Sequence, residues 1–119
     1  MSHIYQELFG LAQKWNGGVI DFINILDAKN VEYVLGNKKP SAFIKIETSY
    51  GTLSVFDRKK DKKIRMDIPH DHPLATHYTE FNGYLWNENN KSYQDDNKIS
   101  VFFDKKDFEK LIDFIREHI

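Results

Sequence analysis

The stretch PHDHPLATH, residues 69–77, brings together three of the chain's five histidines. Imidazole titrates near neutral pH and binds transition metals. His70, His72 and His77 are therefore candidates for a metal-assisted hydrolase, or for a metal-independent ribonuclease or phosphodiesterase. In the metal-independent enzyme, His70 or His72 would be the general base and His77 the general acid. The candidates for holding the phosphate are Lys62, Lys63 and Arg65.

The same stretch also has the composition of a polar turn. Pro69 and Pro73 bracket His70 and His72, and proline is typical of turns and edge strands. The sequence contains no HExxH zinc motif, P-loop, dinucleotide-binding glycine pattern or GxSxG elbow. The pattern favours a turn over a catalytic or metal site and predicts no cofactor. An enzyme that uses the three histidines stays as the alternative.

Length and composition predict one globular domain over residues 1–119. The chain is 40% hydrophobic and 29% charged, and it contains no cysteine for a disulfide, a thiolate zinc site or a nucleophile. Its 17 basic and 18 acidic residues give a net charge of −1, which provides no general attraction to nucleic acid or to an anionic membrane. The N-terminal MSHIYQELFGLAQKW lacks the features of a signal peptide, and no segment is long and apolar enough to span a bilayer, so we expect a cytoplasmic protein.

The hydrophobic period changes from helical to alternating and back to helical along the chain. It predicts an α+β fold with two N-terminal helices, a mostly antiparallel sheet of five or six strands, and one C-terminal helix. The expected helices span 3–15 and 19–30, and the expected strands span 31–35, 42–48, 52–57, 64–68, 76–86 and 98–103. Asp104 is the expected N-cap of the last helix, whose apolar face would be Phe108, Leu111, Ile112, Ile115 and Ile119.

Side chains alternate between the two faces of a strand, so residue parity sorts the strand residues onto faces. The apolar face predicted to lie under the helices contains Ile44, Ile46, Leu53, Val55, Ile64, Met66, Ile68, Phe81, Leu85, Ile99, Val101 and Phe103. The opposite face would carry Phe43, Lys45, Glu47, Ser54, Phe56, Arg65, Asp67, Tyr78, Glu80, Tyr84, Trp86, Ser100 and Phe102. That second face mixes aromatic rings with charged groups, which is typical of protein-binding surfaces.

The leading hypothesis is therefore a small non-catalytic protein-binding module. A toxin-neutralising immunity or inhibitor protein, whose partner is a toxin or effector, is the kind of protein meant, and a homodimer through the same face is a variant. The residues expected to bind the partner are Phe43, Phe56, Arg65, Tyr78, Tyr84 and Trp86, with the polar loop 87–97 as a rim. Rings that only pack on lysine and arginine stems are the structural alternative. A single-stranded nucleic-acid binder is the second functional alternative, disfavoured because the chain has no basic surplus.

Overall fold

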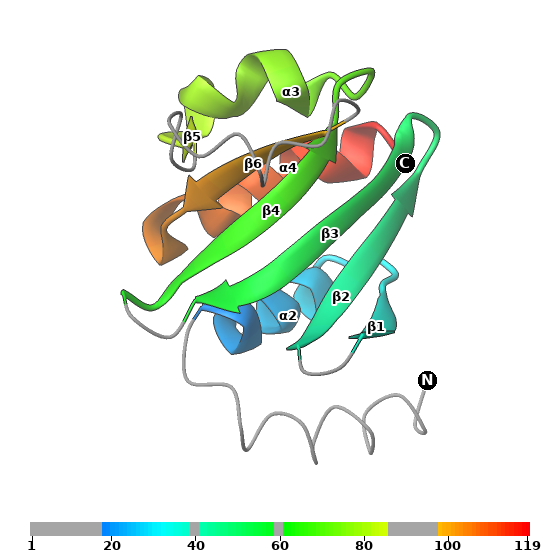
Figure 1. The fold of residues 1–119 in the computed structure, drawn as a ribbon. Coiled ribbons are helices and arrows are strands. Elements are labelled where there is room, and N and C mark those ends of the chain that lie inside the picture. Colours follow the sequence, from blue (N-terminus) through cyan, green and yellow to red (C-terminus); the bar gives the residue numbers. More distant parts are fainter. Residues whose placement is uncertain (1–17, 39–40, 59–60, 86–97) are drawn as a thin grey trace.

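The computed structural model describes residues 18–38, 41–58, 61–85 and 98–119 of the chain (Figure 1). In chain order the elements are α2 (Val19–Ala28), β1 (Val34–Lys38), β2 (Ser41–Thr48), β3 (Gly51–Arg58), β4 (Lys63–Pro69), α3 (Leu74–His77), the 3-10 turn η1 (Tyr78–Phe81), β5 (Tyr84–Leu85), β6 (Lys98–Phe103), the 3-10 turn η3 (Lys105–Asp107) and α4 (Phe108–Glu117). None of the described helices is long and apolar enough to cross a lipid bilayer.

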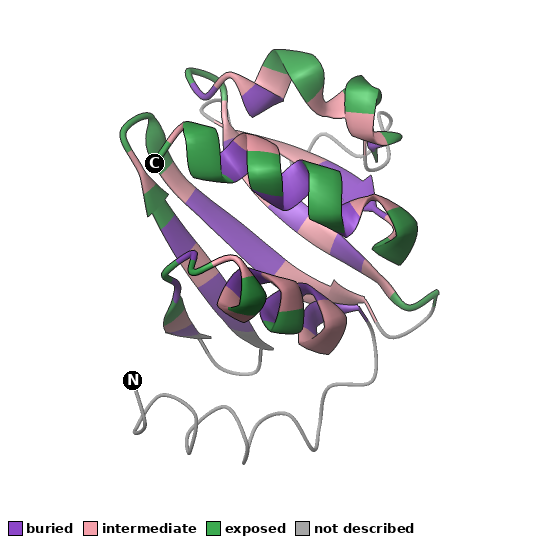
Figure 2. Ribbon diagram, turned by 180° about the vertical axis from the view of Figure 1, so that it is seen from behind, coloured by how far each residue is buried: buried purple, intermediate pink, exposed green. Residues whose placement is uncertain are grey.

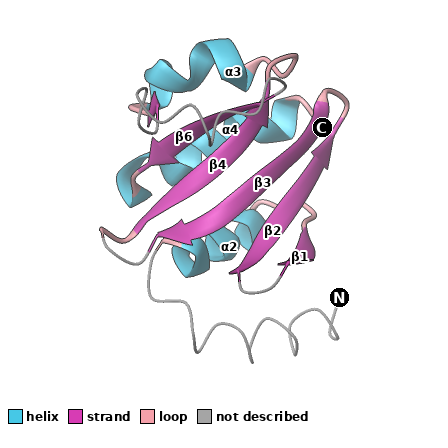
Figure 3. Cartoon of the chain, in the orientation of Figure 1, coloured by secondary structure: helices cyan, strands magenta, loops and turns pink. Residues whose placement is uncertain are grey.

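All six strands belong to one sheet with the order β1-β2-β3-β4-β6-β5, and every neighbouring pair is antiparallel. The expected α+β architecture with a largely antiparallel sheet is thus confirmed. Helices α2 and α4 lie behind the sheet in Figure 1 and in front of it in the reverse view of Figure 2. We call the side under these helices the inner face and the other side the open face. No helix of the described ranges lies across the open face (Figure 3).

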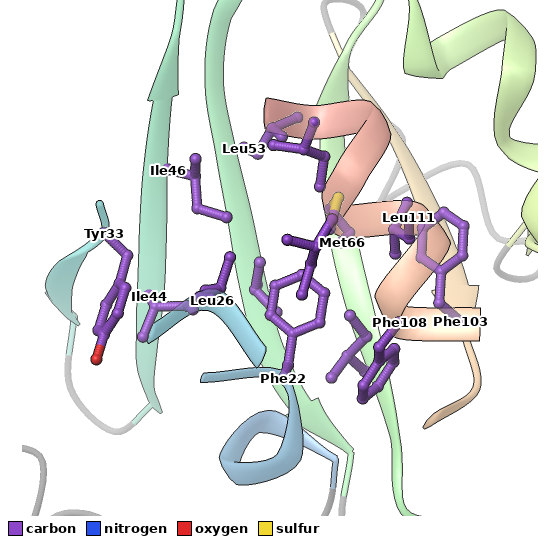
Figure 4. Packing of buried hydrophobic residues seen from close by; sticks show 14 of the residues in the cluster. Phe22, Leu26, Tyr33, Ile44, Ile46, Leu53, Met66, Phe103, Phe108 and Leu111 are labelled. Carbon is purple, nitrogen blue, oxygen red and sulfur yellow. The ribbon is translucent and has the colours of Figure 1, made fainter. Parts of the chain in front are cut away.

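The hydrophobic core fills the space between the inner face and the two helices. Along β2, β3, β4 and β6, residues at alternate positions are fully buried there, as the alternation in the sequence predicts. They are Ile44, Ile46, Leu53, Val55, Ile64, Met66, Ile68, Val101 and Phe103. The helices contribute residues at helical spacing, namely Val19, Phe22, Ile23 and Leu26 from α2 and Phe108, Leu111, Ile112 and Ile115 from α4. Phe22 and Phe108 meet edge to face between the helices, with ring centroids 5.1 Å apart (Figure 4). One continuous cluster therefore holds both helices against the sheet.

The expected strand over 76–86 is wrong. Residues 74–81 form α3 and η1, and only Tyr84 and Leu85 pair with β6. Pro73, which has no N–H to leave unsatisfied, precedes α3 with a φ of −53° that suits a helical turn. Four residues of this segment pack on the core at helical spacing: Leu74, Ala75, Tyr78 and Phe81. That 3.6-residue period, rather than alternation, was the informative signal.

The N-terminal helices, the start of the first strand and the last helix also differ from expectation. Only one described helix, α2, precedes the sheet, and the other expected helix, over 3–15, lies outside the described residues. The first strand begins at Val34 rather than residue 31, because Val31 and Tyr33 turn into the core before pairing starts. The last helix begins at Phe108, after η3, and the Asp104 side chain makes no cap hydrogen bond. Ile119 lies beyond the end of α4 and is exposed.

The start of α2 is anchored by a side chain from the sheet. The backbone N–H of Val19 donates to Asp57 Oδ1 of β3 at 3.1 Å, and a carboxylate at a helix N-terminus also favours the helix dipole. We expect Asp57→Ala to lower the free energy of unfolding by about 1 kcal/mol. Asp57→Asn, which keeps an acceptor oxygen, should cost less. Urea denaturation of the three proteins tests this, and an alanine variant as stable as the wild type would contradict it.

Candidate functional site

A single row of residues crosses the open face from β2 to β5, the strand at one edge of the sheet. In the antiparallel register Phe43 pairs with Phe56, Phe56 with Arg65, Arg65 with Phe102, and Phe102 with Tyr84. These five residues, from five different strands, are called the cross-strand row. Since paired residues on neighbouring strands project from the same face, the register alone places their side chains together.

Cations lie over the rings of the row. The Phe43 and Phe56 rings stack with centroids 4.7 Å apart, and the Arg65 guanidinium carbon lies 4.1 Å from the Phe56 centroid. The Arg58 guanidinium carbon lies 3.9 Å from the Phe102 centroid. These are cation–π distances, at which the positive charge meets the negative face of the ring. Each of these arginines thus lies over a ring of the row.

At the β5 end of the row, a lysine contacts the Tyr84 ring. Tyr84 meets Phe102 edge to face, with centroids 5.3 Å apart. Lys63 Nζ lies 5.0 Å from the Tyr84 ring centroid and donates a hydrogen bond of 3.1 Å to the Tyr84 hydroxyl oxygen. That hydrogen bond is the main reason why the pKa of Lys63 is raised. The ammonium group therefore stays charged beside an exposed ring.

The rings themselves are not equally accessible. Phe102 is only 4% exposed and Phe43 is buried, whereas Tyr84 is 45% exposed. Phe43 folds over Gly36 of β1, where an added Cβ would come within 2.5 Å of the Phe43 ring. The surface offered to another molecule is thus made mainly of the arginines over the rings, the partly exposed Phe56 and the Tyr84 phenol.

The open face is basic although the chain as a whole is not. In strands β2, β3, β4 and β6 it carries five basic residues, Lys45, Arg58, Lys63, Arg65 and Lys98, and two acidic residues, Glu47 and Asp67. Asp67 is engaged by its neighbours: its Oδ1 accepts from Ser100 Oγ at 2.7 Å and lies 3.4 Å from Arg65 Nε. The net charge of the whole chain is −1, so positive charge is concentrated on this face.

A shallow groove of about 420 Å³ lies beside the row. The Phe43 and Phe56 rings form one wall, Ser54 and Asp67 contribute polar atoms, and Lys45 and Lys98 are also among the lining residues. A groove with an aromatic wall and cations suits an apolar group that carries or adjoins a negative charge.

Four of the six residues expected to bind a partner belong to this row: Phe43, Phe56, Arg65 and Tyr84. Tyr78 lies in η1 instead and packs against the core cluster, because the expected strand there is absent. Trp86 and the loop 87–97 lie outside the described residues. Phe102, which parity places on this face, is the fifth member of the row, and Arg58 and Lys63 contact its rings. None of these three is among the six expected residues, because the parity of a single strand does not encode contacts between strands.

The three histidines of the 69–77 stretch lie in different surroundings. His70 is exposed, His72 is only 1% exposed, and His77 is exposed with its Nδ1 2.8 Å from the Pro73 carbonyl oxygen. Among the described residues no group of three histidine, aspartate or glutamate side chains is arranged to hold a metal ion. The ring neighbours of His72 are instead Tyr50, at 5.6 Å between centroids, and His118 of the C-terminal segment, at 6.0 Å.

His72 has a structural role at the start of α3. Its Nδ1 accepts a hydrogen bond of 3.0 Å from the backbone N–H of Leu74, so the neutral ring carries its proton on Nε2. A metal bound at Nε2 would require the proton on Nδ1, where it would oppose the Leu74 N–H. Burial, and secondarily the nearby His118, lowers the pKa of His72 to about 4. The ring is therefore a neutral cap at neutral pH.

Comparisons with protein-family models, with curated proteins and with solved structures found no match to this chain.

The contact between Arg58 and Phe102 should be measurable as a coupling energy. In a double-mutant cycle with Arg58→Gln and Phe102→Leu, we expect a coupling of about 0.5–1 kcal/mol in the free energy of unfolding. The control cycle pairs Lys110→Gln, on the exposed side of α4, with Phe102→Leu, and it should be additive within about 0.3 kcal/mol. Equal coupling in both cycles would show that the arginine is not held by the ring.

Acid should destabilise the protein through His72. The unfolded chain binds a proton at this residue near pH 6.5 and the folded chain only near pH 4, so stability is lost as the pH falls through that window. We expect a contribution of about 3 kcal/mol to the loss. His72→Asn keeps an acceptor for Leu74 but does not titrate, so its free energy of unfolding should fall less between pH 7 and 4. Parallel curves for the two proteins would refute this role.

Proposed function

We propose that the chain is a small non-catalytic module that binds a protein partner through the open face of its sheet. The single observation that supports this most is the cross-strand row, where Arg65 and the neighbouring Arg58 lie over phenylalanine rings beside an exposed Tyr84. Arginine and tyrosine are among the residues that contribute most to protein–protein affinity.

The geometry supports binding because the cations are already ordered. An arginine side chain that is free in solution loses rotamer entropy when it engages a partner. Here the guanidinium groups of Arg58 and Arg65 are fixed by rings at 3.9 and 4.1 Å, and Arg58 Nε also donates to Asp61 Oδ2 at 2.7 Å. A partner's carboxylate would therefore meet donors that are largely pre-oriented.

The size of the face also fits a protein partner. Strands spaced about 4.8 Å apart and about 20 Å long give six strands a face of about 500 Å² in projection. The exposed surface of side chains exceeds this projection, and about 800 Å² per partner is a standard interface. Binding through the open face would cover the corresponding surface of the partner. A toxin or effector that is neutralised by such coverage is the form of partner we infer.

A single-stranded nucleic acid is the second candidate, and the concentration of basic residues on the open face favours it. Two observations count for the protein partner instead. Bases stack on accessible ring faces, but Phe102 is 4% exposed and lies under Arg58. Glu47 also adds negative charge to the same face.

Two tyrosines of equal exposure allow a matched test. Tyr84, on the open face, and Tyr50, in the turn between β2 and β3, are each 45% exposed. With a partner identified by affinity capture and purified, we expect Tyr84→Ala and Arg65→Ala each to weaken binding by about tenfold or more, and Tyr50→Ala to change it little. Calorimetry supplies the affinities, and sedimentation of the chain alone reports self-association through this face.

Three results would contradict the proposal. The first is equal binding by the Tyr84 and Tyr50 variants. The second is affinity for a mixed-sequence single-stranded oligonucleotide that falls steeply with salt. The third is a catalytic activity that disappears when His70, His72 and His77 are replaced together in a variant whose circular dichroism shows that it is still folded.

A further inference from the structure

The buried His72 lies in a cluster of rings that joins three distant parts of the chain. Tyr50, in the β2–β3 turn, and His118, the first residue after α4, cover the His72 ring and lie 6.1 Å from each other. The His118 ring is itself held, since its Nδ1 lies 2.7 Å from the Phe114 carbonyl oxygen of α4. Figure 1 shows the end of α4, the β2–β3 turn and the start of α3 at the same end of the molecule. We call Tyr50, His72 and His118 the ring cluster.

The charged form of His72 does not fit the ring cluster. Protonation would place a hydrogen on Nδ1, which accepts the Leu74 N–H, so two donors would then face each other. The buried Nε2 makes no hydrogen bond with any other described residue. Since an unpaired charge is costly to bury, the charged ring is stable only where water reaches it.

The titratable groups around His72 do not compensate for its charge. Neither Tyr50 nor His118 is a carboxylate, and on its own segment His70 and Asp71 are exposed. Burial and His118 are the causes of its lowered pKa, with no carboxylate to offset them.

The other histidine that follows it differs in this respect. His77 is exposed, and its Nε2 lies 3.8 Å from Glu80 Oε2 of the same segment. Charge on His77 therefore has a nearby partner that moves with it. His72 is the histidine whose charge depends on how this segment packs.

The segment that contains His72 is held by few contacts. Residues 70–81, which we call the strap, include only the four-residue helix α3 and the four-residue turn η1, and Leu74 is the one buried residue of these two elements. The strap also reaches α4 through Phe114, whose ring lies 5.6 Å from the ring of His77 and 5.3 Å from that of Phe81. Such short helical elements depend on packing, and segments with few buried contacts open at low cost.

The end of the strap is fixed to the sheet. Asn82 has a positive φ of 56°, and its Nδ2 donates to Asp107 Oδ1 of η3 at 2.9 Å. Gly83 packs so closely on β6 that an added Cβ would lie 2.6 Å from the Phe103 ring. An opening of the strap therefore stops at Asn82 and leaves β5 paired with β6.

We propose that the strap opens in acid, because the ring cluster holds it closed while His72 is neutral and releases it when His72 takes up a proton. The released strap uncovers the Phe114 ring and the part of the core under Leu74. The sheet and the helices α2 and α4 stay folded. This device does not depend on the proposed function of the open face.

The direction of the pH dependence follows from the burial of His72. In the open strap the ring is solvated and binds its proton near pH 6.5, whereas in the closed strap it does so only near pH 4. The closed strap is therefore favoured above pH 6.5. Each pH unit below that value raises the ratio of open to closed strap by up to tenfold, which amounts to roughly 150-fold at pH 4.

Hydrogen exchange of single amides, followed by NMR on the full chain between pH 7 and 4, tests the proposal. After correction for intrinsic exchange rates, the Leu74 amide should lose roughly 150-fold of its protection over this range. At low urea concentrations its opening free energy should change little, because a local opening exposes little surface. The opening free energies of the protected amides of β3 and β4 should fall with urea. An equal urea slope at Leu74 would overturn the proposal, since the strap would then open only with the whole protein.

Three variants assign the effect to the ring cluster. His72→Asn keeps an acceptor for the Leu74 N–H but takes up no proton, so the pH dependence of Leu74 protection should disappear. His118→Ala uncovers His72, so the His72 ring should titrate at a higher pH and Leu74 protection at pH 7 should fall. The control is His70→Ala, which replaces the exposed histidine two residues away and should change neither quantity.

Two further results would overturn the proposal. One is a pH dependence of Leu74 protection that persists in His72→Asn, and the other is an unchanged titration of His72 in His118→Ala. Circular dichroism and thermal melting check that each variant is folded. If His72→Asn does not fold, the comparison of His118→Ala with His70→Ala still decides the outcome, because His118 lies beyond the end of α4.

Discussion

Burial of one face of the sheet under α2 and α4 is the constraint on which the rest of this structure depends. Each helix has ten residues, a length at which an isolated helix is marginal in water. They persist because Phe22 and Phe108 meet between them and because both helices contribute to one buried cluster with the strand residues. Because alternate residues of the strands are buried in that core, the residues between them must face outward.

The cross-strand row shows how outward-facing strand positions can be occupied by large aromatic rings. A bare phenylalanine on an exposed sheet would leave apolar surface in water, but Arg58 and Arg65 cover the rings with cations whose own outer sides stay hydrated. The same contacts stabilise the pairing of neighbouring strands and fix the direction of the guanidinium groups. The proposed recognition would therefore use the same contacts that stabilise the sheet, and a substitution in the row is expected to affect both.

The buried histidine belongs to a separate part of the molecule. His72 satisfies a helix N–H and packs near Tyr50 and His118, so its chemistry is explained by a cap that must stay neutral. The open face contains no histidine among its described strand positions, so His72 acts on the fold from outside that face.

The sequence by itself determined the elements whose period is local. Alternation marked the strands around 44, 55, 66 and 101, and helical spacing marked α2 and α4, because burial on one side imposes those periods on any chain. Parity likewise assigned Phe43, Phe56, Arg65 and Phe102 to one face. Only the tertiary structure decided that these four are neighbours in one row, that Arg58 covers Phe102, and that His72 lies near His118 rather than His77. Register between strands and the meeting of distant segments depend on how the whole core packs, and no local period encodes them.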